Sequence, residues 1–138
     1  MDRVVFACVH NAGRSQMAAA FFSVLADPRR AEATSAGTQP GHRVQPEVVE
    51  AMREVGIDRG TKRPQKLTDD LVRGAALLIT MGCGDECPYV PGLQRDDWPL
   101  EDPKARSMED VRRIRDEIRN RVGALIDARG WRGARRAL

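Results

Sequence analysis

Short apolar runs of the buried-strand type alternate along this chain with segments of helical pattern, and this alternation constrains the fold most. Residues 3–9 and 75–80 are near-continuous apolar runs with the length of a fully buried strand. The predicted strands are 3–9, 31–36, 75–80 and 94–98, and the predicted helices are 15–25, 46–55, 68–73 and 108–126. This order predicts an α/β fold, a small doubly wound, mainly parallel four-stranded sheet with helices on both faces.

The last predicted helix carries the most regular pattern. Ser107 is placed to cap its N-terminus, with Asp110 three residues further on. Apolar residues then recur at helical spacing at Val111, Ile114, Ile118, Val122, Leu125 and Ile126. Opposite charges four residues apart predict ion pairs on its solvent face, between Glu109 and Arg113, Arg112 and Asp116, and Glu117 and Arg121.

The positive charge of the chain is concentrated at its C-terminal end. The net charge is +3, but residues 129–138 contain four Arg and no acidic residue, so that 19 basic and 20 acidic residues remain elsewhere. Only 4% of the residues are aromatic, and no basic face with stacking aromatics for nucleic acid is indicated. We therefore expect one domain over residues 1–128, an Arg-rich tail over 129–138 and no nucleic-acid partner.

The composition is that of a globular protein outside the membrane. Apolar residues make up 41% and charged residues 31% of the chain. No apolar run approaches the roughly 20 residues of a membrane span, and the N-terminus lacks the layout of a signal peptide. We expect a cytoplasmic protein with no membrane contact.

All three cysteines fall at the predicted carboxyl edge of the sheet, where sites form in open α/β folds. Cys8 ends the first strand, and Cys83 and Cys87 follow the strand at 75–80. An odd number of cysteines without a secretion signal favours thiol or metal chemistry over a structural disulfide framework.

The segment from Cys8 to Ser15, here called the 8–15 loop, joins the first strand to the first helix. A tight loop at a helix N-terminus turns backbone N–H groups inward, which makes a cradle for a tetrahedral oxyanion. The predicted cradle residues are Val9, His10, Asn11, Ala12, Gly13, Arg14 and Ser15. The planar guanidinium of Arg14 can bind two anion oxygens, and the same field favours the nucleophilic thiolate of Cys8.

Individual loop residues have predicted conformational roles. Gly13 allows a close backbone approach or a positive φ, and Asn11 tolerates the left-handed conformation while its side chain braces the loop. Ser15 can donate a hydrogen bond to the Cys8 sulfur, whereas His10 either helps to position the ligand or is simply exposed. In an Arg-rich chain a Cys with Arg six residues later also arises by chance, and Cys8 would then be only a buried strand residue.

The Cys-x5-Arg-Ser pattern of the 8–15 loop resembles the low-molecular-weight protein tyrosine phosphatases. Further segments resemble the redox branch of that superfamily, the thioredoxin-coupled arsenate reductases. These segments are 14–18, 35–37, 80–83, Cys87 with Pro88, and Trp98 followed by Glu101-Asp102-Pro103. The similarity extends to about Leu125.

This resemblance implies a reaction and a role for each thiol. Cys8 attacks arsenate and forms a thiol–arsenate adduct, and Asp102 protonates the departing oxygen. Cys83 then attacks Cys8, arsenite leaves, and Cys87 attacks Cys83 to pass the disulfide outward to thioredoxin. The implied partners are arsenate, with phosphate or sulfate as competing oxyanions, and thioredoxin as the electron source, with no bound cofactor.

Other functions remain compatible with the residues. A phosphotyrosine phosphatase would use the same anion site, although residues 104–106, Lys-Ala-Arg, lack the aromatic side chains with which that family grips a phosphotyrosine ring. The three thiols could instead form an arsenite or metal sensor. A zinc clip on Cys83 and Cys87 would need further ligands, and the only histidines are His10 and His42.

Some members of the resembled branch bind a potassium ion near the loop through acidic and hydroxyl groups. The corresponding positions carry Ala19, Arg63 and Gln65 in this chain. We therefore expect no potassium requirement and no resident metal.

Overall fold

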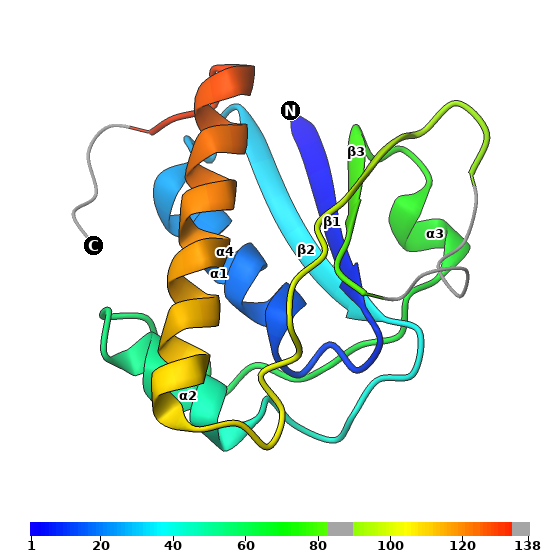
Figure 1. The fold of residues 1–138 in the computed structure, drawn as a ribbon. Helices are drawn as coiled ribbons and strands as arrows, with labels where there is room; N and C mark the ends of the chain where they lie inside the picture. Colours follow the sequence, from blue (N-terminus) through cyan, green and yellow to red (C-terminus); the bar gives the residue numbers. More distant parts are fainter. Residues whose placement is uncertain (83–89, 134–138) are drawn as a thin grey trace.

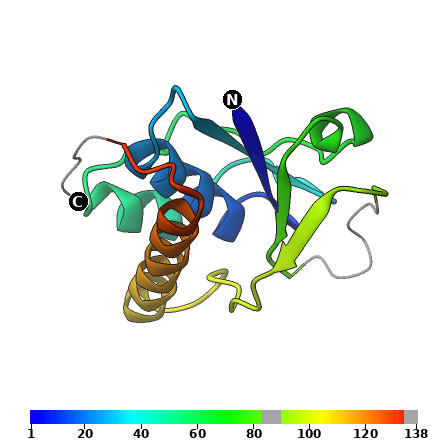
Figure 2. The ribbon, with the colours of Figure 1, turned by 90° about the horizontal axis from the view of Figure 1, so that it is seen from above.

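Four parallel strands form one sheet in the order β2-β1-β3-β4, of which β1, β2 and β3 are labelled in Figure 1 and β4 is the yellow-green arrow of Figure 2. The strands are β1 (Asp2–Cys8), β2 (Ala31–Gly37), β3 (Leu77–Thr80) and β4 (Gln94–Asp97). The computed structural model describes residues 1–82 and 90–133. The predicted fold class is confirmed, and within the described residues every strand pairing is parallel.

The two faces of the sheet are covered by different helices. Helices α1 (Arg14–Leu25), α2 (Pro46–Arg53) and α4 (Met108–Arg129) lie on one face, and the short α3 (Asp69–Val72) lies on the other (Figures 1 and 2). Side chains of β1 alternate accordingly, because Val4 and Phe6 belong to the larger core, whereas Val5 and Ala7 belong to the smaller core beneath α3. All four of these β1 side chains are fully buried, so β1 is the central strand that carries Cys8 to the edge of the sheet.

The predicted helix starts are confirmed by their caps. The Ser107 hydroxyl accepts a hydrogen bond from the Asp110 N–H at 3.1 Å, and the Thr68 hydroxyl accepts one from the Leu71 N–H at 3.3 Å. Two other boundaries differ from the prediction by two residues. Helix α2 ends at Arg53 rather than residue 55, and β3 begins at Leu77 rather than residue 75.

The expected domain boundary at residue 128 falls inside the packed structure. Helix α4 continues to Arg129 and ends at Gly130, whose φ of 71° is the left-handed conformation that a helix C-cap favours. Trp131 is then buried, with its ring centroid 5.8 Å from that of Phe22. The Arg-rich composition concealed this aromatic anchor, and only residues 134–138 of the expected tail lie outside the described residues.

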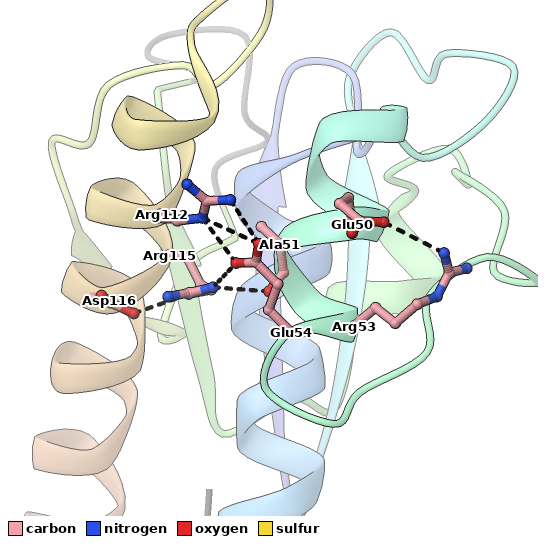
Figure 3. Close-up of polar contacts among 7 residues, drawn as sticks. All are labelled: Glu50, Ala51, Arg53, Glu54, Arg112, Arg115 and Asp116. Atoms are coloured by element: carbon pink, nitrogen blue, oxygen red, sulfur yellow. Dashed lines mark hydrogen bonds and ion pairs between the residues drawn. The ribbon is translucent and has the colours of Figure 1, made fainter.

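The charged face of α4 makes fewer ion pairs along the helix than its sequence predicts. Of the three predicted pairs, only Glu117 with Arg121 is found, at 3.4 Å. The guanidinium of Arg112 instead reaches Glu54, just after α2, at 2.7 Å (Figure 3). The nearly buried Arg115 donates to the same carboxylate and to the Ala51 carbonyl, both at 2.9 Å. Within residues 1–82 and 90–133, no helix is both long and apolar enough to cross a membrane.

Replacing Glu54 with Gln is expected to lower the melting temperature at neutral pH, because both guanidinium groups lose their shared carboxylate. The hydrogen bond from Arg112 lowers the pKa of Glu54 below its ordinary value of 4.5, although desolvation opposes the shift. A lowered pKa in the folded state means that this contribution is complete above pH 4.5 and is lost as the pH falls through the folded-state pKa. Melting curves of wild type and E54Q should therefore differ at pH 7 and converge in acid.

The matched control is Glu50→Gln in α2, where the carboxylate forms an ion pair with the exposed Arg53 at 3.5 Å (Figure 3). Exposed pairs of this kind contribute little to stability. Equal melting shifts for the two variants would contradict a specific role of Glu54 in joining α2 to α4.

Candidate active site

The 8–15 loop is held from outside by hydrogen bonds to its carbonyl oxygens. The N–H groups of the segment after β2 donate to four of these carbonyls, from Thr38 to Cys8, Gln39 to Val9, Gly41 to His10 and Gln45 to Ala12, at 2.8–3.2 Å. Because neighbouring C=O and N–H groups of a trans peptide point in opposite directions, the amides face the interior of the loop. Within the described residues, the N–H groups of residues 10–15 have no protein acceptor, which leaves them available to an oxyanion.

Asn11 and Gly13 have the conformational roles that the sequence predicts. Asn11 has a φ of 51°, in the left-handed region. Gly13 has a φ of −140°, so its role is close approach rather than positive φ. A Cβ at Gly13 would lie 2.9 Å from the Cγ of Pro103, so glycine allows the loop to pass close to the segment that contains Asp102.

Cys8 is buried at the end of β1, and its sulfur lies 2.9 Å from the hydroxyl oxygen of Ser15. The same oxygen accepts a hydrogen bond from Asn11 Nδ2 at 2.7 Å. The orientation of the Asn11 amide is fixed because its Oδ1 accepts the N–H of Gln65 at 2.9 Å. While its oxygen accepts from Asn11, the Ser15 hydroxyl can still donate its hydrogen to the Cys8 sulfur.

Arg14 lies almost fully buried beside the loop. Its Nη1 donates to the Leu100 carbonyl at 3.0 Å, and its Nη2 lies 3.9 Å from Asp102 Oδ2. The Nε is buried without a hydrogen-bond partner among the described residues, so it is available to a ligand oxygen. Gly82 has a φ of +100°, which favours glycine at this position, and a Cβ there would displace the Arg14 guanidinium.

Asp102 lies half-buried at the rim of the same site. Its Oδ1 accepts the N–H of Lys104 at 3.0 Å, and Arg106 Nε donates to its backbone carbonyl at 2.9 Å. These contacts form a turn, and they leave Oδ2 directed toward Arg14. Asp102 therefore forms a turn and also lies beside the anion loop.

Not every predicted site residue can be placed. Cys83 and Cys87 lie in the segment 83–89, outside the described residues. The first described range ends at Gly82, close to Cys8. β3 pairs with β1 as far as Thr80 and Ala7, and the Met81 N–H then donates to the Ala7 carbonyl at 2.7 Å. His10 is half-exposed, with its Nδ1 3.0 Å from the Gln39 carbonyl, and it braces the segment that holds the loop.

A second layer of polar residues around Asn11 was not predicted from the sequence. Gln16 Nε2 donates to the Asn11 carbonyl at 3.0 Å and to its Oδ1 at 3.2 Å. Arg59 in turn donates to Gln16 Oε1 at 2.5 Å, and burial lowers the pKa of Arg59. Gln16 directly follows the Arg-Ser pair and could have been suspected, whereas Arg59 and Gln65 come from a stretch without a recognisable pattern.

The described residues offer no clear metal site. Within these ranges, no group of three or more His, Cys, Asp or Glu side chains is placed to hold a metal ion. The positions that correspond to potassium ligands in the resembled branch, Ala19, Arg63 and Gln65, line one pocket together. That pocket contains cationic rather than acidic side chains, so its chemistry does not fit a cation.

Comparison with known proteins agrees with this geometry. The family model for low molecular weight phosphotyrosine protein phosphatases matches residues 3–130. The chain belongs to this family. Arsenate reductase from Staphylococcus aureus is 33% identical to this family member, over 84% of the chain and 89% of that protein. A Halobacterium salinarum protein provisionally named an arsenate reductase is 39% identical, over 88% of the chain and 89% of that protein.

Solved structures of arsenate reductases share the fold. A thioredoxin-dependent arsenate reductase from Corynebacterium glutamicum matches with a TM-score of 0.78 and 38% identity, covering 93% of this chain. This chain spans only 61% of that protein. An arsenate reductase in the reduced state matches with a TM-score of 0.80 and 34% identity, over 93% of this chain and 98% of that one.

Proposed function

We propose that this protein reduces arsenate to arsenite, with Cys8 as the nucleophile. The observation that carries the proposal is the buried Cys8 sulfur at the base of a loop whose amides have no protein acceptor within the described residues. Arsenate is a tetrahedral oxyanion, which such a loop suits. The proposal is further supported by relatives of 33–39% identity whose names are those of arsenate reductases.

The first step forms a bond between sulfur and arsenic. The amides of Val9, His10, Asn11, Ala12, Gly13, Arg14 and Ser15 and the Arg14 guanidinium bind the arsenate oxygens. The Cys8 thiolate attacks arsenic, and Asp102 donates a proton to the oxygen that leaves as water. The 3.9 Å separation of Asp102 Oδ2 and Arg14 Nη2 supports this role, because both side chains then contact one bound anion.

The second step transfers two electrons from two thiols. The Cys83 thiolate attacks the Cys8 sulfur, an S–S bond forms, and the pair of electrons of the S–As bond remains on arsenic, which leaves as arsenite. Cys87 then attacks Cys83, which frees Cys8 and leaves a Cys83–Cys87 disulfide. Thioredoxin reduces this disulfide, and no resident cofactor takes part. Phosphate and sulfate, which have the same tetrahedral shape as arsenate, compete for the loop.

One coupled assay tests the activity. Arsenate-dependent NADPH oxidation is measured with thioredoxin and thioredoxin reductase, beside hydrolysis of p-nitrophenyl phosphate. A parallel arm replaces thioredoxin with glutaredoxin and glutathione, since a Synechocystis relative at 35% identity is named a glutaredoxin arsenate reductase. We expect arsenate-dependent oxidation with thioredoxin. Rapid phosphate ester hydrolysis without any arsenate-dependent oxidation would instead establish a phosphatase.

Asp102→Asn is expected to reduce arsenate turnover by about 10²-fold, the usual scale for the loss of a general acid, with a smaller effect on binding. The control is Glu101→Gln, which removes the neighbouring carboxylate that pairs with Arg113 at 2.8 Å. Initial rates of both variants at saturating arsenate provide the comparison. If D102N stays within about twofold of wild type, Asp102 serves only the turn that it forms with Lys104.

A further inference from the structure

The pocket lined by Ala19, Arg63 and Gln65 has a volume of about 190 Å³ and lies beside the 8–15 loop, between α1, β2 and the segment that follows α2. We call it the 59–63 pocket after its three cationic residues, Arg59, Lys62 and Arg63. Since one water occupies roughly 30 Å³ of liquid, the space accommodates a small oxyanion with several waters. None of the residues assigned to the proposed reaction lines it.

The 59–63 pocket is positively charged without compensation. None of its lining residues is acidic, and within the described residues its three cations make no ion pair with a carboxylate. The Nε of Arg59 is buried without a hydrogen-bond partner in the same part of the chain. Burial lowers the pKa of Arg59, which is the effect of desolvating a cation that has no counter-charge.

The neutral groups of the 59–63 pocket are also suited to an anion. Thr34 Oγ1 accepts a hydrogen bond from Gln65 Nε2 at 3.1 Å, which leaves its hydroxyl hydrogen free to donate. The largely buried Ser35 also lines the pocket, and its side chain points to the face of β2 opposite to that of Thr34. Two guanidinium groups and one ammonium group thus line a single space of oxyanion size, without any acidic side chain.

We propose that the 59–63 pocket is a second oxyanion site, which binds phosphate or the phosphate group of a small phosphomonoester. The proposal does not depend on the proposed reduction of arsenate. The pocket is connected to the 8–15 loop through hydrogen bonds to Asn11. Gln16 and Gln65, which both line the pocket, donate to Asn11 Oδ1 at 3.2 and 2.9 Å. Asn11 also donates to the Ser15 hydroxyl that touches the Cys8 sulfur, so an anion here has a hydrogen-bonded route to the nucleophile.

The test must distinguish this pocket from the loop, because phosphate is expected at both. Inorganic phosphate is titrated into the ¹⁵N-labelled protein, and amide shifts are followed at Thr34, Ser35 and Gln65 for the pocket and at Gly13 and Arg14 for the loop. We expect both groups of amides to saturate. In K62Q/R63Q we expect phosphate affinity at the pocket amides to fall at least about tenfold, the scale of lost charge-assisted hydrogen bonds, and affinity at the loop amides to persist.

The matched control is R73Q/R119Q, which removes the same charge from two arginines outside the pocket and should titrate like wild type. A parallel titration with glycerol 3-phosphate distinguishes free phosphate from a phosphomonoester, and binding of either supports the proposal. Pocket amides that never saturate, or equal weakening in both double variants, would overturn it. If K62Q/R63Q loses its dispersed spectrum, the single variant R63Q is used, with R119Q as its control.

Discussion

Cys8→Ser is expected to abolish arsenate reduction while leaving oxyanion binding largely intact. A serine hydroxyl is a poor nucleophile near neutral pH and cannot supply the sulfur that the electron transfer requires. The groups that bind the anion are unchanged, because the loop amides and Arg14 do not depend on the sulfur for their positions. The loop carbonyls are held by the segment 38–45, and the Arg14 guanidinium is held by the Leu100 carbonyl.

The comparison variant for this prediction is Arg14→Lys, which retains the positive charge and Cys8. Lysine cannot replace the planar guanidinium, since a point charge does not bind two oxygens in a fixed geometry. Phosphate binding, followed by calorimetry, should thus be strong in C8S and weak in R14K, whereas arsenite production should be undetectable in C8S. Arsenite production by C8S at a rate near that of wild type would refute the assignment of Cys8.

The fold was predictable from the sequence to the extent that burial leaves a local pattern. β1 is buried on both faces, so it appears as a continuous apolar run. Helix α4 buries one stripe and exposes the rest, so it appears as a 3.6-residue period. β4 buries none of its four residues, and its hydrophobic pattern is correspondingly weak.

The sequence-based predictions were wrong where a side chain contacts a residue far away in the sequence. The side chain of Arg112 is long and flexible. It pairs with the Glu54 carboxylate, which directly follows α2, and not with Asp116 on its own helix. That choice depends on how α4 packs against α2, which no spacing along α4 encodes. Trp131 was likewise included in an Arg-rich tail by composition, although its ring packs against Phe22.

In the candidate site, too, local features could be predicted from the sequence and long-range contacts could not. The anion loop could be predicted because its donors are successive amides of one short segment, and sequence order alone brings them together. The contacts that complete it could not be predicted. Arg14 meets Leu100 across 86 positions, and Gln65 meets Asn11 across 54. Hydrogen bonds between residues so far apart leave no periodic pattern in the sequence, because only the folded structure brings the partners together.

Cys87→Ser is expected to complete a single turnover and then stop. In the proposed relay Cys83 can still attack Cys8, so one equivalent of arsenite is released for each protein molecule. Without Cys87 nothing inside the protein attacks Cys83, and the enzyme accumulates as a Cys8–Cys83 disulfide. The described chain supports this pairing, because Met81 stands beside Cys8 in the sheet edge and only Gly82 separates Met81 from Cys83.

Gly82, which directly precedes Cys83, has a positive φ that L side chains rarely adopt. A disulfide needs Cα atoms about 4.4–6.8 Å apart, so the backbone at Gly82 must keep the freedom that only glycine has. The companion variant Cys83→Ser should form the arsenate adduct and release no arsenite. Wild type treated with arsenate and no reductant should contain oxidised Cys83–Cys87 and a free Cys8.

Peptide mapping under non-reducing conditions, with arsenite measured in the same samples, distinguishes these three states. The burst of arsenite is about one equivalent for wild type and for C87S and zero for C83S, so the two serine variants are controls for each other. Adding thioredoxin should restore many turnovers only to wild type. If C87S turns over repeatedly with thioredoxin, an external thiol attacks the adduct or the first disulfide directly. Cys87 would then have no part in catalysis, and the chemistry of the site would reduce to the 8–15 loop, Asp102 and a donor from outside the chain.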